Sequence, residues 1–107
     1  MHINPTTALA TLQHIPQRFV EVFKHGTLAV EIYQPIGEDH QQPHDRDEVY
    51  LIISGTSEFV CGENQMTVQA GDFLFVPTAE SHRLINFSEN FATWVLFYGP
   101  KGGEQHD

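Results

Sequence analysis

Two short segments of the chain carry side chains that could hold a metal ion. In QPHDRDEVYLIISG (residues 42–55), His44 and Glu48 precede an apolar run, and in GDFLFVPTAESHRLIN (residues 71–86), His82 precedes a second one. Glutamate is rarely interior unless something pairs with it. If the two strand entries meet, two imidazoles and one carboxylate converge, and this ligand set suits Fe(II), Mn(II), Ni(II) or Zn(II). Read singly, each segment is also consistent with a polar loop before a strand.

Most of the elements that would position these residues read as β-strands. Short alternating or fully apolar runs are separated by turns that contain Gly or Pro. The expected strands cover residues 18–24, 27–34, 47–54, 56–61, 66–69, 73–77, 82–87 and 92–99. Short strands at such regular spacing are typical of a sandwich or barrel, so the chain is expected to be all-β.

One helix is expected, near the N-terminus. The segment TTALATLQHI (residues 6–15) has apolar residues close to helical spacing, follows Asn4 and Pro5, and is limited by Pro16. We expect one domain over residues 1–107, with an N-terminal segment (1–17), a β-barrel (18–98) and a mobile, Gly-rich tail (99–107).

Three of the strands are apolar on both faces. The runs VYLII, FLFV and WVLFY have apolar residues at odd and at even positions, and successive residues of a strand point to opposite faces. A barrel of this size buries only its inner face, so the outer face needs a cover. The N-terminal helix and the hairpin that follows it cover part of it, and a second copy of the chain is expected to cover the rest, giving a homodimer. The alternative is a monomer whose own first 35 residues suffice.

Composition restricts the class of partner. The 107 residues include 14 acidic and 5 basic side chains, for a formal charge of -9, which argues against nucleic acids and anionic membranes. No segment has the length of a transmembrane helix, and the N-terminus lacks the pattern of a signal peptide, so a cytoplasmic protein is expected. The single cysteine, Cys61, lies in a strand and reads as a buried apolar residue rather than a nucleophile.

The candidate residues form two spaced motifs, Gln42-x-His44-x3-Glu48-x6-Gly55 and Gly71-x5-Pro77-x4-His82-x3-Asn86. Both resemble the two motifs of the cupin superfamily, and the chain is similar to a small, single-domain, type-2 cupin. The resemblance implies a cupin-type β-barrel, or jelly roll, that holds a divalent transition metal ion (Fe, Mn, Ni or Zn). It implies metal ligands at His44, Glu48 and His82.

The chain departs from the family pattern at two positions. Gln42 replaces the first histidine, and Ala79 replaces a glycine of the second motif. A glutamine oxygen can bind a cation but is weaker than imidazole for a transition metal. The ligand set is therefore either Gln42 with the other three residues, or those three with an added water; His40 is a further substitute ligand. Alanine at 79 is a mild change only if the backbone does not need positive φ.

Strand alternation suggests the lining of a substrate pocket. Tyr50 shares a face with Glu48 and is expected to point inward, and Phe75 is expected to do the same together with Phe73. Arg46 has the same parity as Glu48, so it either faces the site and anchors a carboxylate or lies in solvent. A pocket lined by aromatic and aliphatic residues suits a small, largely apolar ligand.

The activity stays open at this level. The resemblance implies a metal-dependent enzyme of the dioxygenase, decarboxylase, isomerase or lyase type acting on a small organic molecule, with no catalytic residue identified. The alternative is a non-catalytic module that binds or senses a small ligand, with a weak or empty metal site. A phosphosugar isomerase is disfavoured because only Arg46 is placed to meet a phosphate.

Overall fold

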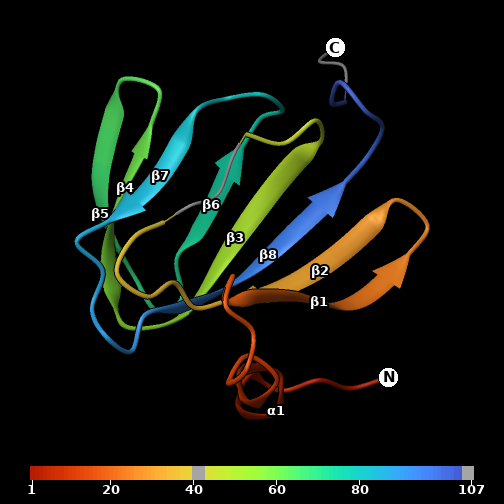
Figure 1. Ribbon diagram of the computed structural model, residues 1–107. Coiled ribbons are helices and arrows are strands. Elements are labelled where there is room, and N and C mark those ends of the chain that lie inside the picture. The colour runs from red at the N-terminus through yellow and green to blue at the C-terminus, as the bar shows by residue number, and fades with distance from the viewer. Residues whose placement is uncertain (40–42, 105–107) are drawn as a thin grey trace.

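A computed structural model describes residues 1–39 and 43–104, which form eight strands and one short helix (Figure 1). The strands are β1 (Phe19–His25), β2 (Leu28–Tyr33), β3 (Asp47–Ser54), β4 (Thr56–Cys61), β5 (Asn64–Gln69), β6 (Phe73–Val76), β7 (His82–Ile85) and β8 (Ala92–Tyr98). Two antiparallel sheets, ordered β1-β2-β8-β3-β6 and β5-β4-β7, face each other across the interior. The all-β, jelly-roll architecture that the sequence predicts is confirmed.

The helix α1 (Pro5–Ala10) is shorter than expected from the sequence. The side chain of Asn4 caps its start by accepting a hydrogen bond from the Thr7 amide at 2.9 Å, with Pro5 in the first turn. The Thr11 hydroxyl donates to the Ala8 carbonyl at 2.6 Å, and the chain continues in turns instead of helix. The expected helix over residues 6–15 is therefore wrong in its second half. Among the described residues, no helix is long and apolar enough to cross a membrane.

Two apolar clusters lie on opposite faces of the five-stranded sheet. The inner cluster fills the barrel and includes Tyr33, Tyr50, Phe59, Leu84 and Phe97. The outer cluster joins α1 to the backs of β1, β2 and β8, and it includes Ala8, Leu12, Val20, Ile32 and Trp94. Strands β1, β2 and β8 thus bury apolar side chains on both of their faces.

The outer face of β3 and β6 is left uncovered by the described chain. Leu51 lies opposite Phe73, and Val49 lies opposite Phe75. Leu51, Phe73 and Phe75 are 37%, 63% and 43% exposed. The outer cluster around the N-terminal helix therefore covers β1, β2, β8 and Ile53 of β3, and leaves these three side chains exposed.

A buried aspartate in the loop after β2 links the two sheets. Asp39 accepts a hydrogen bond from the Tyr33 hydroxyl at 2.7 Å and another from the Leu84 amide at 2.8 Å. Tyr33 belongs to β2 and Leu84 to β7, so one carboxylate joins both sheets. Bonds to a charged acceptor are stronger than neutral ones, which holds this loop across the barrel.

The segment after β8 folds back onto the start of β3. The Gly102 amide donates to the Asp45 carbonyl at 2.8 Å, and the Glu104 amide donates to the Asp47 carboxylate at 2.9 Å. The part of the expected mobile tail that the structure describes is thus hydrogen-bonded to the barrel, while residues 105–107 lie outside the described chain.

Candidate metal centre

Glu48 and His82 meet inside the barrel. Glu48 is the second residue of β3 and His82 the first of β7, and these strands belong to different sheets. Nε2 of His82 lies 3.0 Å from Oε1 of Glu48, without the alignment of a hydrogen bond. The two side chains are only 1% and 2% exposed. The structure therefore brings together a buried imidazole and a buried carboxylate from the two sequence motifs.

The second ring nitrogen fixes the tautomer of His82. Nδ1 lies 2.9 Å from the Glu80 carbonyl oxygen, which can only accept, so Nδ1 carries a proton. In neutral imidazole, Nε2 then presents a lone pair to the Glu48 carboxylate, and two acceptors face each other. Burial lowers the pKa of His82, but the contact with Glu48 and the bond to Glu80 outweigh it and raise that pKa above its ordinary value. Binding of a proton or another cation between Nε2 of His82 and the Glu48 carboxylate is therefore favoured.

His44 lies beside this pair without joining it. Its ring packs against the ring of Phe97, with centroids 4.5 Å apart, and Phe97 is the cross-strand neighbour of Glu48. Within residues 1–39 and 43–104, no three His, Cys, Asp or Glu side chains are already gathered around a common metal position. The two remaining ligand candidates, Gln42 and His40, lie outside the described residues.

Three buried side-chain atoms lack a hydrogen-bond partner in the described chain. They are Nε2 of His44, Oε2 of Glu48 and Nε2 of His82. An unsatisfied buried polar atom costs roughly 1–3 kcal/mol, so these three atoms favour binding of a ligand. The donor set therefore fits a divalent transition metal ion.

The loops that carry the two histidines are bonded to each other. The Ala79 amide donates to the His44 carbonyl at 2.8 Å, and the Thr78 amide donates to the Asp47 carboxylate at 3.0 Å. Ala79 has a φ of 60°, a left-handed conformation that favours glycine. Ala79 stands where the family pattern has glycine, and its backbone does adopt positive φ. The alanine is therefore strained.

Tyr50 and Arg46 differ in their relation to the site. Tyr50 is fully buried on the inner face, with its ring centroid 6.0 Å from that of His82. Arg46 instead donates to the Thr27 carbonyl in the β1–β2 turn, and its guanidinium lies 5.9 Å from the Phe97 ring centroid. These two contacts therefore hold the positive charge of Arg46 at the edge of the site.

The expected inward orientation of Phe75 is wrong. Val76 pairs with Glu48 and Leu74 with Tyr50, so the even-numbered residues of β6 share the inner face. Leu74 and Val76 are buried, whereas Phe75 is 43% exposed on the outer face. Because all four residues of FLFV are apolar, the sequence of this strand contains no signal that distinguishes its two faces.

Two further titratable side chains near the pair stay neutral. Cys61 lies directly opposite His82 in the β4–β7 pairing. Burial, followed by the charges of Glu80 and Glu48, raises the pKa of the Cys61 thiol, which favours its unreactive protonated form, although the side chain is only partly buried and not buried as the sequence predicted. Burial and then Glu48 raise the pKa of Tyr50 well above its usual value. Both groups therefore face the site in protonated form.

A carboxylate that the sequence analysis passed over also faces the interior. Glu31 alternates with Ala29 and Tyr33 on β2, and those two residues belong to the inner core. Burial, followed by the charges of Glu21 and Glu48, raises the pKa of Glu31 to about 7. The signal was present in the run LAVEIY, because strand alternation places Glu31 between two core positions.

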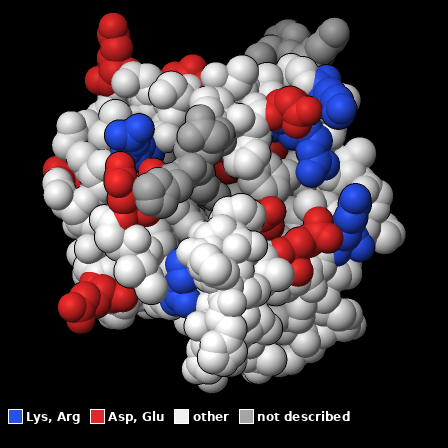
Figure 2. Space-filling model, viewed as in Figure 1, with Lys and Arg blue, Asp and Glu red and all other residues white. Residues whose placement is uncertain are grey.

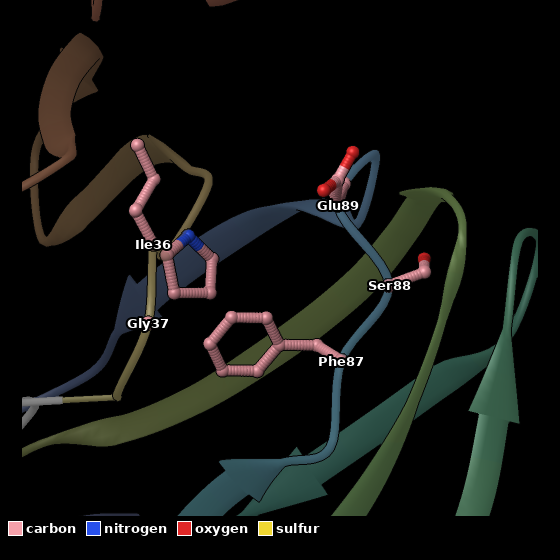
Figure 3. Close-up of a pocket in the computed structure, with 6 residues that line it drawn as sticks. Ile36, Gly37, Phe87, Ser88 and Glu89 are labelled. Atoms are coloured by element: carbon pink, nitrogen blue, oxygen red, sulfur yellow. The ribbon is translucent and has the colours of Figure 1, made fainter.

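A cavity of about 430 Å³ lies apart from these donors. It is lined by Pro35, Ile36, Gly37, Phe87, Ser88 and Glu89 (Figure 3). The Phe87 ring points toward the segment of Ile36 and Gly37. The Ser88 hydroxyl already donates to Asn90 at 2.7 Å, and Glu89 is exposed. This cavity offers no unpartnered buried donor among the described residues, so the chemistry is assigned to the barrel interior.

Comparison with known proteins agrees with the architecture. A family model described as a cupin domain matches residues 29–98. Over 63 residues, the chain is 33% identical to the uncharacterized protein SCO3923 of Streptomyces coelicolor. This match covers 59% of the chain and 60% of that protein, so the chain matches well under the full length of this relative.

Solved structures share the fold. A cupin-2 domain containing protein from Shewanella frigidimarina superposes with a TM-score of 0.73 at 20% identity, covering 91% of this chain and 94% of that one. The DMSP lyase DddQ of Ruegeria pomeroyi gives a TM-score of 0.62 at 24% identity, covering 70% of this chain and 40% of the enzyme. At these sequence identities, the similarity shows a shared fold and nothing more.

Proposed function

This chain belongs to the Cupin_2 family, and on that premise we propose that it binds a divalent transition metal ion and acts on a small organic molecule. His44, Glu48 and His82 would hold the ion, with Gln42 as a weaker fourth ligand. Iron, manganese, nickel and zinc all suit two imidazoles and a carboxylate. The proposal is for a metal-dependent enzyme of the dioxygenase, isomerase or lyase type.

One observation carries the proposal. In its neutral form, with the proton on Nδ1, His82 presents the lone pair of Nε2 to the Glu48 carboxylate at 3.0 Å in a buried site. Two acceptors so placed repel each other strongly at low dielectric, and a cation between them removes the repulsion. Nε2 of His44 is buried and unpartnered in the described chain, and it would supply a third donor if the His44 ring turned from Phe97 toward the ion.

The residues around the pair determine what the site can do. A bound ion of this type supplies a Lewis acid or a redox centre. The Glu80 carbonyl orients the His82 ring and keeps its proton on Nδ1. Tyr50, Phe59 and Phe97 line the interior and exclude water around the reacting group. Lyase chemistry is one candidate, since the fold is shared with a DMSP lyase.

Metal content and turnover test the proposal. Protein purified without added metal and stripped with a chelator would be titrated with Fe(II), Mn(II), Ni(II) and Zn(II), with bound metal measured by elemental analysis. We expect about one ion per chain for the unmodified protein and for His14→Ala, which removes an exposed imidazole, and loss of binding in His82→Ala. Failure of the unmodified protein to retain any of the four ions would overturn the proposal. Metal binding without turnover over a substrate panel would reduce it to a binding module.

We also propose that the protein forms a homodimer through the outer face of β3 and β6. Leu51, Phe73 and Phe75 expose large apolar side chains there, and β6 contains no charged residue. A chain with a formal charge of -9 repels its copy over most of its surface, so an uncharged apolar face is the place where two copies can meet.

A further inference from the structure

The first residue of β3, Asp47, joins three segments of the chain at one end of the barrel. Asp47 is 5% exposed and directly precedes Glu48. One of its carboxylate oxygens accepts a hydrogen bond from the Thr78 amide at 3.0 Å, and the other accepts one from the Glu104 amide at 2.9 Å. Thr78 lies in the β6–β7 loop, which leads to His82, and Glu104 follows β8. One buried side chain thus connects the two segments that carry Glu48 and His82 with the segment after β8.

The β6–β7 loop in turn holds the backbone of His44. The His44 carbonyl accepts a hydrogen bond from the Ala79 amide at 2.8 Å and a longer one from the Thr78 hydroxyl at 3.3 Å. A backbone held in this way limits the conformations of the His44 ring, so less conformational entropy is lost when the ring binds an ion. The position of His44 therefore depends on Asp47, through the loop that Asp47 holds.

The C-terminal segment (residues 99–104) packs closely against Asp47. It returns to the end of the barrel where β3 begins and β6 ends (Figure 1), and the Gly102 amide donates to the Asp45 carbonyl at 2.8 Å. Gly103 has a φ of 85°, and a methyl group on its Cα would lie 2.9 Å from Oδ1 of Asp47 and 3.1 Å from Cγ2 of Thr78. Any side chain at residue 103 would therefore push this segment away from Asp47.

The contacts of Asp47 are with backbone amides, although charged side chains are close at hand. Figure 2 shows acidic and basic side chains next to each other on the surface near the end of β8. Within residues 1–39 and 43–104, the Asp47 carboxylate pairs with no Lys or Arg. Hydrogen bonds to a charged acceptor are shorter and stronger than neutral ones. The two bonds of Asp47 therefore fix the positions of two backbone segments relative to β3.

We propose that Asp47 and the C-terminal segment position the metal centre. The segment holds Asp47, Asp47 holds the β6–β7 loop, and that loop holds the backbone of His44. This inference rests on the proposed function and assigns the residue that aligns its third ligand. Groups that orient metal ligands without touching the ion account for about 10–100-fold in metal affinity. Loss of this junction is therefore expected to weaken metal binding while Glu48 and His82 are retained.

Two glycine variants test the junction without changing any charge. Gly103→Ala places a methyl group against the Asp47 carboxylate, whereas Gly102→Ala has a similar positive φ, 88°, but its methyl group meets no atom within 4 Å. In the metal-free proteins, hydrogen exchange of the Ala79 amide reports whether the loop still holds the His44 carbonyl. We expect this amide to exchange about tenfold faster in Gly103→Ala than in Gly102→Ala.

Titration with Co(II), a spectroscopic substitute for Zn(II), tests the role in metal binding. The visible absorption of bound Co(II) depends on its ligands and geometry, so it distinguishes loss of His44 from a general loss of stability. We expect Gly103→Ala to bind Co(II) about tenfold more weakly than Gly102→Ala, with a spectrum that approaches that of His44→Ala. Asp47→Asn should resemble Gly103→Ala, because its amide nitrogen cannot accept the second hydrogen bond. Asp72→Asn, which removes the same charge from a turn at the other end of β3, should leave affinity and spectrum unchanged.

The outcomes separate this inference from the proposed function. A Gly103→Ala protein that binds Co(II) with the affinity and spectrum of Gly102→Ala would overturn the inference, whatever its stability in urea. If the unmodified protein binds no Co(II), the proposed metal centre is wrong, and exchange of the Ala79 amide decides the rest. Faster exchange confined to Gly103→Ala would preserve the link from the C-terminal segment to the His44 loop, and equal exchange in the two glycine variants would remove it.

Discussion

Nε2 of His82 and Oε1 of Glu48 lie 3.0 Å apart in the barrel, although they begin strands of two different sheets. The contact is buried and joins β7, an edge strand of one sheet, to β3, an interior strand of the other. A cation bound at this position would therefore link the two sheets. Ligand binding here is expected to be visible in the stability of the whole barrel.

Metal binding should raise the melting temperature, and Glu48→Gln should abolish the increase. A ligand that binds only the folded state at 100 times its dissociation constant stabilises it by about 2.7 kcal/mol, which is a shift of several degrees for a domain of this size. Differential scanning calorimetry with and without metal measures the effect. Glu63→Gln is the control for loss of one charge. A shift that persists undiminished in Glu48→Gln would contradict the assignment of this carboxylate as a ligand.

Ala79→Gly should stabilise the protein. The φ of 60° at this residue costs an alanine about 1–2 kcal/mol, and glycine returns roughly half of that as lost chain entropy, so the net gain is about 0.5–1 kcal/mol. Urea unfolding of the metal-free protein measures it. Ala70→Gly, in the exposed turn after β5, has no positive φ to relieve and should not stabilise. A destabilised Ala79→Gly protein would show that the backbone strain is relieved in another way.

The sequence was sufficient for the strands, because the strand runs are local patterns. The approach of Glu48 to His82 joins distant segments, and it was expected from the resemblance of the two motifs to those of cupins. The sequence was insufficient for features that depend on strand register or on a backbone φ angle. Phe75 was assigned to the wrong face because FLFV is apolar throughout, and only its pairing with Val49 decides its orientation. The strain at Ala79 arises from a turn closed by the His44 carbonyl, a contact between distant segments. The position of His44 beside Phe97 likewise depends on the folded loop.

Glu31 should make the stability of the protein fall as the pH rises. Its pKa is about 7 in the folded state against 4.5 ordinarily, so between these values the folded protein binds more protons than the unfolded chain. Raising the pH through this window therefore removes stability, by about 1–2 kcal/mol after allowance for the solvent around a partly exposed carboxyl.

Glu31→Gln should remove that part of the pH dependence. We expect it to be more stable than the unmodified protein at about pH 8 and of similar stability near pH 5, because the unmodified carboxyl is protonated in the folded state at the lower pH. Urea unfolding at both values measures the difference. Glu63→Gln should show the pH profile of the unmodified protein. Parallel profiles for all three proteins would contradict the raised pKa at Glu31.

The proposed homodimer should depend on the exposed aromatic residues of β6. Changing both Phe73 and Phe75 to Ser removes large apolar side chains that face outward from the barrel, so the fold should persist while the association is lost. Sedimentation velocity should give twice the 12.1 kDa chain mass for the unmodified protein and the single mass for the double variant. Met66→Ser is the control, because Met66 is 42% exposed on β5, in the other sheet. A single-chain mass for the unmodified protein at micromolar concentration would show that this apolar face stays open to solvent, and a dimer that survives in the double variant would place the contact on another surface.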